Sequence, residues 1–231
     1  IEAEYYAGGI AGQASASFAD CSNKGKVTAT EEYAAGIVAE ALYPSSIRNS
    51  VNEAVITSEE HVAGIVSLSD DHSDKNQFVI DNCSNKADIN YAITKSAFGE
   101  VGGIGGELGA GTVISNCFNL GNLQSEVTSV RWTGGIVGEM TGEEGAKSQI
   151  LNCYNEGNVT GLNSVGGIAG KFDGNGGYAI VENSYNLGNV TSTHARLSYV
   201  GGLVGNSGGY DLIDSWNAGT VSGYGEGIGG L

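Results

Sequence analysis

Apolar residues recur at two fixed positions of a ten-residue block that is found seven times along the chain. The first position is held by Phe18, Ile47, Ile80, Ile114, Ile150, Val181 and Leu212. The second position, nine residues later, is held by Val27, Ile56, Ile89, Leu123, Val159, Val190 and Val221. Between them lies an asparagine, at Asn23, Asn52, Asn85, Asn119, Asn155, Asn186 and Asn217. These asparagines are 29 to 36 residues apart, a period typical of repeat proteins.

A second block in each repeat places a glycine before an aliphatic residue. Its centres are Ile10, Ile37, Ile65, Ile104, Ile136, Ile168, Leu203 and Ile228. No segment keeps the apolar period of about 3.6 residues that marks a long helix. We therefore expect short β-strands, with loops between the blocks that absorb the differences in repeat length.

Polar residues also keep their places around each asparagine. Three positions before it stand Asp20, Asn49, Asn82, Asn116, Asn152, Asn183 and Asp214. Two positions before it stand Cys21, Ser50, Cys83, Cys117, Cys153, Ser184 and Ser215. Two positions after it stand Gly25, Ala54, Ala87, Gly121, Gly157, Gly188 and Gly219. Small and polar side chains in register indicate columns in a stacked structure.

This pattern predicts an all-β fold, a parallel β-solenoid (β-helix) of about seven to eight coils. Equivalent residues of successive coils stack about 4.8 Å apart, so the asparagines should form a ladder of side-chain amides. The glycine before each aliphatic centre suits a positive φ or a close approach of two backbones. The odd separation of the two apolar positions requires a turn, which we place near residues 119–121. Handedness and the number of strands per coil stay open.

The repeats run through the whole chain, so residues 1–231 are expected to form a single solenoid domain. The sequence opens in mid-repeat on Gly8, Gly9 and Ile10, which favours a piece excised from a longer protein. It shows neither a signal segment nor an apolar run near the roughly 18 residues that span a bilayer. We expect no membrane insertion.

The charge balance narrows the choice of partners. The formal net charge is −16, from 26 acidic and 10 basic residues. A phosphate backbone or an anionic membrane would repel such a surface, so nucleic acid is not an expected partner.

The four cysteines allow two interpretations. Neighbouring coils would bring Cys83 near Cys117, and Cys117 near Cys153, close enough for a disulfide. Serine stands at the same position in three other repeats, which favours a column of small side chains. The cysteine spacings match no CxxC zinc pattern.

The longest distance between aliphatic centres, from Ile65 to Ile104, contains a candidate metal site. Asp70, Asp71, His72 and Asp74 offer carboxylates and one imidazole, ligands suited to Ca²⁺ or Zn²⁺. No second ligand set of matching spacing accompanies them, which favours a solvated loop. We expect no cofactor.

The residue just before the ladder asparagine becomes aromatic in the last four repeats, at Phe118, Tyr154, Tyr185 and Trp216. If exposed, these rings would form a stripe able to bind glycan or a host protein. If half-buried at a corner, they would stabilise the solenoid itself. The second interpretation is favoured, and side-chain exposure decides between them.

Two segments resemble a known repeat family. Val-Gly-Gly-Ile-Ala-Gly at residues 165–170 and Ile-Leu-Asn-Cys-Tyr-Asn-Glu-Gly-Asn-Val-Thr at residues 150–160 resemble the GLUG motif of bacterial surface proteins. That group includes IgA-cleaving metallopeptidases and haemagglutinin-like adhesins. The resemblance implies an extracellular, cell-surface or secreted protein of which this chain is a non-catalytic segment. No His-Glu-x-x-His zinc motif is present, so no peptidase residue is carried over.

Three functions follow, in order of preference. The first is a structural segment that spaces or presents adjacent domains of the same polypeptide. The second is an adhesin module that binds host glycoprotein or glycan through the aromatic residues. The third is a polysaccharide-active β-helix enzyme, which requires carboxylates in register on adjacent coils. The column that starts at Asp20 is mainly Asn, which argues against an enzyme.

Overall fold

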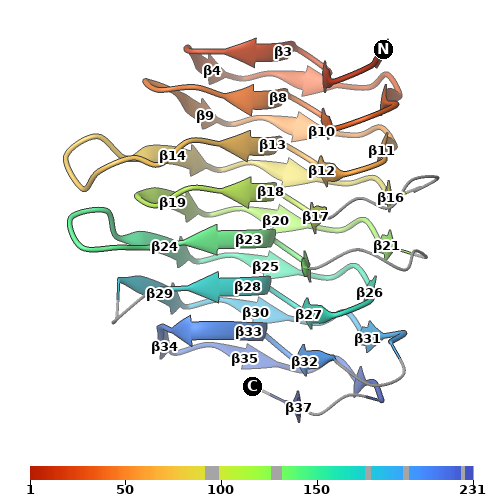
Figure 1. Ribbon diagram of the computed structural model, residues 1–231, viewed down its shortest axis with the longest axis vertical. Helices are drawn as coiled ribbons and strands as arrows, with labels where there is room; N and C mark the ends of the chain where they lie inside the picture. The colour runs from red at the N-terminus through yellow and green to blue at the C-terminus, as the bar shows by residue number, and fades with distance from the viewer. Residues whose placement is uncertain (92–98, 126–131, 175–177, 195–197, 225–226, 231) are drawn as a thin grey trace.

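The computed structural model shows a stack of windings, each made of five short strands that belong to five different parallel sheets (Figure 1). It describes residues 1–91, 99–125, 132–174, 178–194, 198–224 and 227–230. Within those ranges the secondary structure consists of 37 strands, and no helix there could cross a membrane. We name the five sheets A to E in the order in which the chain visits them.

Sheets A and B each contain eight strands. Sheet A consists of β1 (Glu2–Ala3), β6 (Val27–Ala29), β11 (Ile56–Ser58), β16 (Ile89–Tyr91), β21 (Leu123–Ser125), β26 (Val159–Gly161), β31 (Val190–Ser192) and β36 (Val221–Ser222). Sheet B consists of β2 (Tyr6–Gly8), β7 (Tyr33–Ala35), β12 (His61–Ala63), β17 (Glu100–Gly102), β22 (Trp132–Gly134), β27 (Ser164–Gly166), β32 (Tyr199–Gly201) and β37 (Gly227–Gly229).

Sheets C, D and E each contain seven strands. Sheet C consists of β3 (Ala11–Ala14), β8 (Val38–Ala41), β13 (Val66–Ser69), β18 (Gly105–Leu108), β23 (Val137–Thr141), β28 (Ala169–Asp173) and β33 (Val204–Gly209). Sheet D consists of β4 (Ser17–Ala19), β9 (Ser46–Arg48), β14 (Phe78–Asp81), β19 (Thr112–Ser115), β24 (Ser148–Leu151), β29 (Ala179–Glu182) and β34 (Asp211–Ile213). Sheet E consists of β5 (Ser22–Asn23), β10 (Val51–Asn52), β15 (Ser84–Asn85), β20 (Phe118–Asn119), β25 (Tyr154–Asn155), β30 (Tyr185–Asn186) and β35 (Trp216–Asn217).

Each strand pairs in parallel with its equivalent one winding away, and the repeat positions stay in register. In sheet E, Asn85 pairs with Asn119 and Asn119 with Asn155. A register shift occurs between Phe172 and Asp173 in sheet C. The predicted all-β parallel solenoid is confirmed. The predicted count is slightly high, because the seven sheet E strands are related by about six turns.

The buried aliphatic residues form two apolar columns inside the tube. The larger one lies under sheets C and D and includes Ile65, Ile80, Ile104 and Ile114, all fully buried. The other lies under sheets A and B and includes Ile56, Ile89 and Leu123 in the first windings, and Val159 and Val190 in later ones. The two apolar positions of the repeat thus both face the interior, from different sheets.

The corner between sheets D and E is made by the Asp/Asn position three residues before the ladder asparagine. All seven residues have positive φ between 46° and 56°: Asp20, Asn49, Asn82, Asn116, Asn152, Asn183 and Asp214. Asn and Asp tolerate this left-handed conformation better than other non-glycine residues. The turn expected near residues 119–121 is also present, because β20 ends at Asn119 and β21 begins at Leu123.

The glycine before the aliphatic centre serves close packing in the first seven blocks, and the alternative of a positive φ is wrong. A Cβ at Gly135 would lie 2.1 Å from the carbonyl oxygen of Gly167 and 2.4 Å from Cγ of Asn155. The positive-φ glycines among the described residues are Gly111, Gly145 and Gly209, which lie elsewhere. The ladder asparagine therefore occupies the space that a side chain at this glycine would need.

Candidate functional site

The seven ladder asparagines form one continuous column of hydrogen bonds. Nδ2 of each residue donates to Oδ1 of the next at 2.7 to 2.8 Å, through Asn23, Asn52, Asn85, Asn119, Asn155, Asn186 and Asn217. Five of the seven are fully buried, from Asn52 to Asn186.

The same Nδ2 groups also hold the turn that follows sheet E. Asn119 donates to the carbonyl oxygen of Gly121 at 2.8 Å, and Asn155 donates to that of Gly157 at 2.7 Å. Both amide hydrogens and the amide oxygen are then paired inside the protein. The ladder is a structural element, with no polar atom left over for a ligand.

The Cys/Ser column forms a second ladder. The backbone N–H of Cys83 donates to Sγ of Cys117 at 3.3 Å, and the N–H of Cys153 donates to Oγ of Ser184 at 3.1 Å. All four cysteines are free thiols. Burial raises the pKa of the Cys117 thiol well above its ordinary value. Cysteine and serine can replace each other at this position because Sγ and Oγ both accept the backbone N–H of the preceding winding.

The four aromatic residues stack face to face along the outside of sheet E. Ring centroids are 5.0 Å apart between Phe118 and Tyr154, 5.1 Å between Tyr154 and Tyr185, and 4.8 Å between Tyr185 and Trp216. The first three are half-buried, whereas Trp216 is 48% exposed. Both faces of Tyr154 and Tyr185 are covered by neighbouring rings. Their edges alone remain for a partner, which favours the structural interpretation.

The acidic stretch at residues 70–74 is used within the protein. Asp71 accepts a hydrogen bond from the N–H of Ala110 at 2.8 Å, and Asp74 accepts one from the N–H of Lys147 at 2.6 Å. His72 is buried between the rings of Tyr43 and Phe78, and burial lowers its pKa. The ligand atoms of this stretch do not converge in the described part of the chain.

A different set of ligand atoms converges, and the sequence analysis missed it. His61 of β12 and Glu100 of β17 lie on neighbouring windings of sheet B, and Glu107 belongs to β18 of sheet C. Nδ1 of His61 lies 2.5 Å from Oε2 of Glu100 and 3.7 Å from Oε2 of Glu107. One ligand atom from each of the three residues lies within 4.8 Å of the others. The three residues are hereafter the His61 cluster.

The His61 cluster places ionisable groups in a largely buried position. Residue exposure is 8% for His61 and 4% for Glu100. Burial lowers the pKa of His61, but Glu100, followed by Glu107 and Glu60, outweighs burial and raises it overall. Burial also raises the pKa of Glu107. Nδ1 of His61 and Oε2 of Glu100 are thus paired with each other, and the pair is ionic when His61 is protonated.

Comparison with known families finds a match in the first winding. The GLUG motif matches residues 3–28. These residues are one complete winding, from the end of β1 to the middle of β6, which are neighbours in sheet A. The chain contains a GLUG motif. The suspected resemblance is thereby confirmed for this winding. No curated protein and no solved structure matches the chain.

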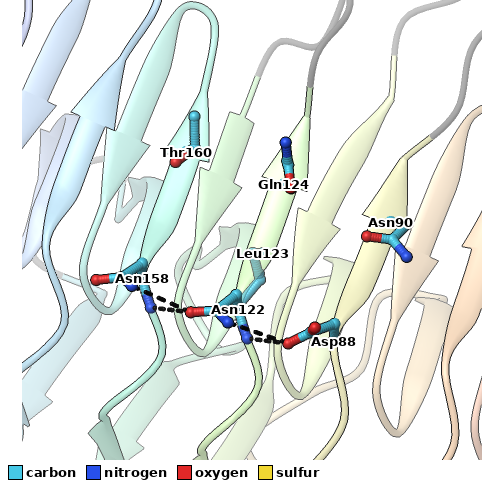
Figure 2. Close-up of a pocket in the computed structure, with 7 residues that line it drawn as sticks. All are labelled: Asp88, Asn90, Asn122, Leu123, Gln124, Asn158 and Thr160. Carbon is cyan, nitrogen blue, oxygen red and sulfur yellow. Dashed lines mark hydrogen bonds between the residues drawn. The ribbon is translucent and has the colours of Figure 1, made fainter.

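The outer corner of sheet A carries a polar ladder along three successive windings (Figure 2). Asn122 donates through its N–H and Nδ2 to Oδ1 of Asp88, and Asn158 donates in the same way to Oδ1 of Asn122, all at 2.9 to 3.2 Å. Beside this ladder runs a second column, Asn90, Gln124 and Thr160. The two columns line a shallow cavity of about 280 Å³.

Carboxylates in register do occur in this solenoid, although not in the column that starts at Asp20. Glu107 pairs with Glu139 on the next winding of sheet C, and Glu139 with Lys171 on the one after. Lys171 Nζ lies 2.8 Å from Oε1 of Glu139. This column lies after the second block, away from the asparagines, and its residue types differ from one repeat to the next, so the repeat pattern alone does not reveal it.

Proposed function

We propose that this GLUG solenoid is a non-catalytic structural segment of a bacterial surface or secreted multidomain protein, where it spaces or presents adjacent domains. The observation that carries the proposal is the unbroken asparagine ladder. Each winding is fixed to the next by this ladder and by strand pairing in five sheets. Bending the tube would break buried hydrogen bonds, which are costly to leave unpaired.

The surface charge fits an extracellular role in a large polypeptide. A net charge of −16 keeps such a rod soluble and repels nucleic acid and anionic membranes. The expected partners are the neighbouring domains of the same polypeptide. Each winding adds about 4.8 Å, so the number of windings sets the distance between them.

The spacer proposal is tested by measuring that distance. Spin labels at Thr28→Cys and Ser222→Cys lie in one column of sheet A, six windings and thus about 29 Å apart. The four native cysteines are first replaced by serine, which occupies the same column in other windings. Deleting residues 118–153 removes one winding and joins equivalent positions.

Pulsed electron–electron double resonance should give a narrow distribution of distances between the two labels in the protein without the deletion. In the deletion variant the mean should shorten by about 5 Å with no broadening. A broad distribution, or a mean that does not change with the deletion, would contradict a stiff spacer.

A second candidate function, binding of host glycoprotein or glycan, is supported by one observation. Trp216 ends the aromatic stack on sheet E and is 48% exposed. The variant with Tyr154, Tyr185 and Trp216 replaced by alanine distinguishes the two functions on a glycan and immunoglobulin array. A binding module would lose saturable binding and keep its melting temperature. A spacer would show no binding and would lose stability with the stack.

A further inference from the structure

We propose that the His61 cluster binds one Zn²⁺ ion, which clips together two neighbouring windings of the solenoid. The three ligands would be Nδ1 of His61 and one carboxylate oxygen each from Glu100 and Glu107. Imidazole nitrogen and carboxylate oxygen are established zinc ligands. The proposal goes beyond the spacer function and does not depend on it.

The spacing of the ligand atoms suits zinc after a small movement. Zinc bonds to these atoms are about 2.0 to 2.2 Å, which places two ligands of a tetrahedral ion roughly 3.3 Å apart. Nδ1 of His61 and Oε2 of Glu107 are 3.7 Å apart. Oε2 of Glu100, at 2.5 Å from Nδ1, needs to retreat by roughly 1 Å, a shift that rotation of the Glu100 side chain provides.

The carboxylates around His61 carry more negative charge than one imidazole can neutralise. Nδ1 of His61 faces Oε2 of Glu100 at 2.5 Å, and carboxylate oxygens of Glu107 and Glu60 lie 3.7 and 4.0 Å from the same imidazole. Two carboxylates and a neutral imidazole carry a charge of −2, which a divalent ion cancels. The alternative, a protonated His61 between Glu100 and Glu107, neutralises one of the two carboxylates and leaves a net charge of −1.

A route for the ion is present. Glu107 lines an open cavity of about 350 Å³ together with Asp70, Asp71 and Glu139. Its side chain is 44% exposed, so it joins the buried pair to solvent. The acidic wall attracts cations. Asp70 and Asp71, considered as metal ligands from the sequence, thus lie at the mouth of this cavity.

The position of the cluster gives the ion a mechanical role. His61 and Glu100 are 39 residues apart, at the two ends of the winding that holds the longest distance between aliphatic centres. An ion held by both residues closes that winding into a loop, which restricts the unfolded chain. It would stabilise the rod where the inserted chain is longest.

The test is a titration of the chelator-treated chain with Zn²⁺, measured by calorimetry. Melting temperatures are then compared with and without Zn²⁺. The wild type should bind one Zn²⁺ per chain and melt at a higher temperature with Zn²⁺, whereas Ca²⁺, which prefers six to eight oxygens, should have no such effect. Glu107→Gln should lower Zn²⁺ affinity at least about 10-fold. Because Glu107 is half-exposed, this variant should fold and melt as the wild type does without zinc.

His61→Gln should lower Zn²⁺ affinity to a similar extent, and Asp70→Asn, which changes the cavity wall only, should stay within about threefold of the wild type. Co²⁺ gives an independent signal, because coordination by His61 produces visible absorption that His61→Gln removes. Absence of Zn²⁺ binding by the wild type, or equal affinity in Glu107→Gln and the wild type, would overturn the proposal.

Discussion

Asn119 shows why the ladder position is occupied by asparagine in every repeat. Its side chain accepts from Asn85 and donates to Asn155 and Gly121, all at 2.7 to 2.8 Å. Aspartate would lack the donor, and glutamine would need space that Gly103 and its neighbours do not leave, since a Cβ on Gly103 would already lie 2.5 Å from Cγ of Asn119.

Asn119→Ala should lower the free energy of unfolding by at least about 2 kcal/mol, because the Asn85 amide and the Asn155 oxygen stay buried and lose a partner. Asn217→Ala is the matched control at the end of the ladder. Asn217 is half-buried, so water can replace its bonds, and the loss should be under about 1 kcal/mol. Urea denaturation measures both. Equal losses would show that the ladder has no cooperative role.

Asn152 represents the corner residues with positive φ. Asn152→Ala should destabilise the protein by about 1 kcal/mol, because alanine is strained at a φ of 55°. Asn152→Gly should be close to neutral, since glycine adopts this conformation freely. Thermal melting of the two variants checks the difference. If alanine and glycine behave alike, the backbone conformation does not explain this column.

Asp81 contributes a pH-dependent part of the stability. Hydrogen bonds from Ser115 and Asn116, at 2.7 and 2.8 Å, lower the pKa of its carboxyl, with Arg48 adding a smaller effect. A carboxyl whose pKa is lower when folded stabilises above its unfolded pKa, near 4, and this contribution is lost as the pH falls through the folded value.

Asp81→Asn should therefore cost about 1 kcal/mol at neutral pH and make unfolding less pH-dependent below about pH 4. Ser115→Ala should reduce the same pH dependence in part. Urea denaturation from pH 2 to 7 tests this. If the free energy of unfolding of Asp81→Asn changes with pH as that of the wild type does, Asp81 is not the source of the pH dependence.

At the scale of the element, the corner between sheets B and C leaves no space for a side chain at Gly135. Gly135→Ala should cost about 3 kcal/mol or more, because the new Cβ meets backbone and a buried side chain on the next winding. Gly25→Ala is the control: its Cβ would have 3.9 Å to the nearest atom, and Ala54 and Ala87 occupy equivalent positions. The melting temperatures should differ clearly. Similar values would contradict close packing at Gly135.

The elements themselves were largely predictable, because each strand is short and its inward residues recur. The period at Ile80, Ile114 and Ile150 is enough to place sheet D, and that at Asn85, Asn119 and Asn155 to place sheet E. The five-strand winding was not predictable. The corner at Asn116 depends on a backbone angle, and an Asn/Asp preference alone has several explanations.

The His61 cluster escaped the sequence analysis for a physical reason. His61 and Glu100 meet because they occupy the same position of sheet B on successive windings, in β12 and β17, but the residue type at that position is not repeated along the chain. In sheet B, Tyr33 pairs with His61 and Trp132 pairs with Glu100. A search of the residue before each Gly-aliphatic block would have placed His61 beside Glu100, but not Glu107 near both.

At the scale of the whole molecule, the solenoid is a one-dimensional stack in which the strands of each winding pair with those of the adjacent windings. The loop at Asp74 reaches further and binds Lys147, two windings along. The stack runs from the first winding to the last with the same five sheets (Figure 1). Stability should then be spread along the rod, and a local defect should weaken two interfaces rather than the whole.

The central claim is that successive windings lie in register and share one column of asparagine amides. Solution NMR of the side-chain amide protons tests it directly. We expect cross-winding nuclear Overhauser effects between Asn85, Asn119 and Asn155, and slow exchange with water along the buried part of the column. Amide protons that exchange as fast as those of exposed asparagines, with no cross-winding effects, would contradict the account.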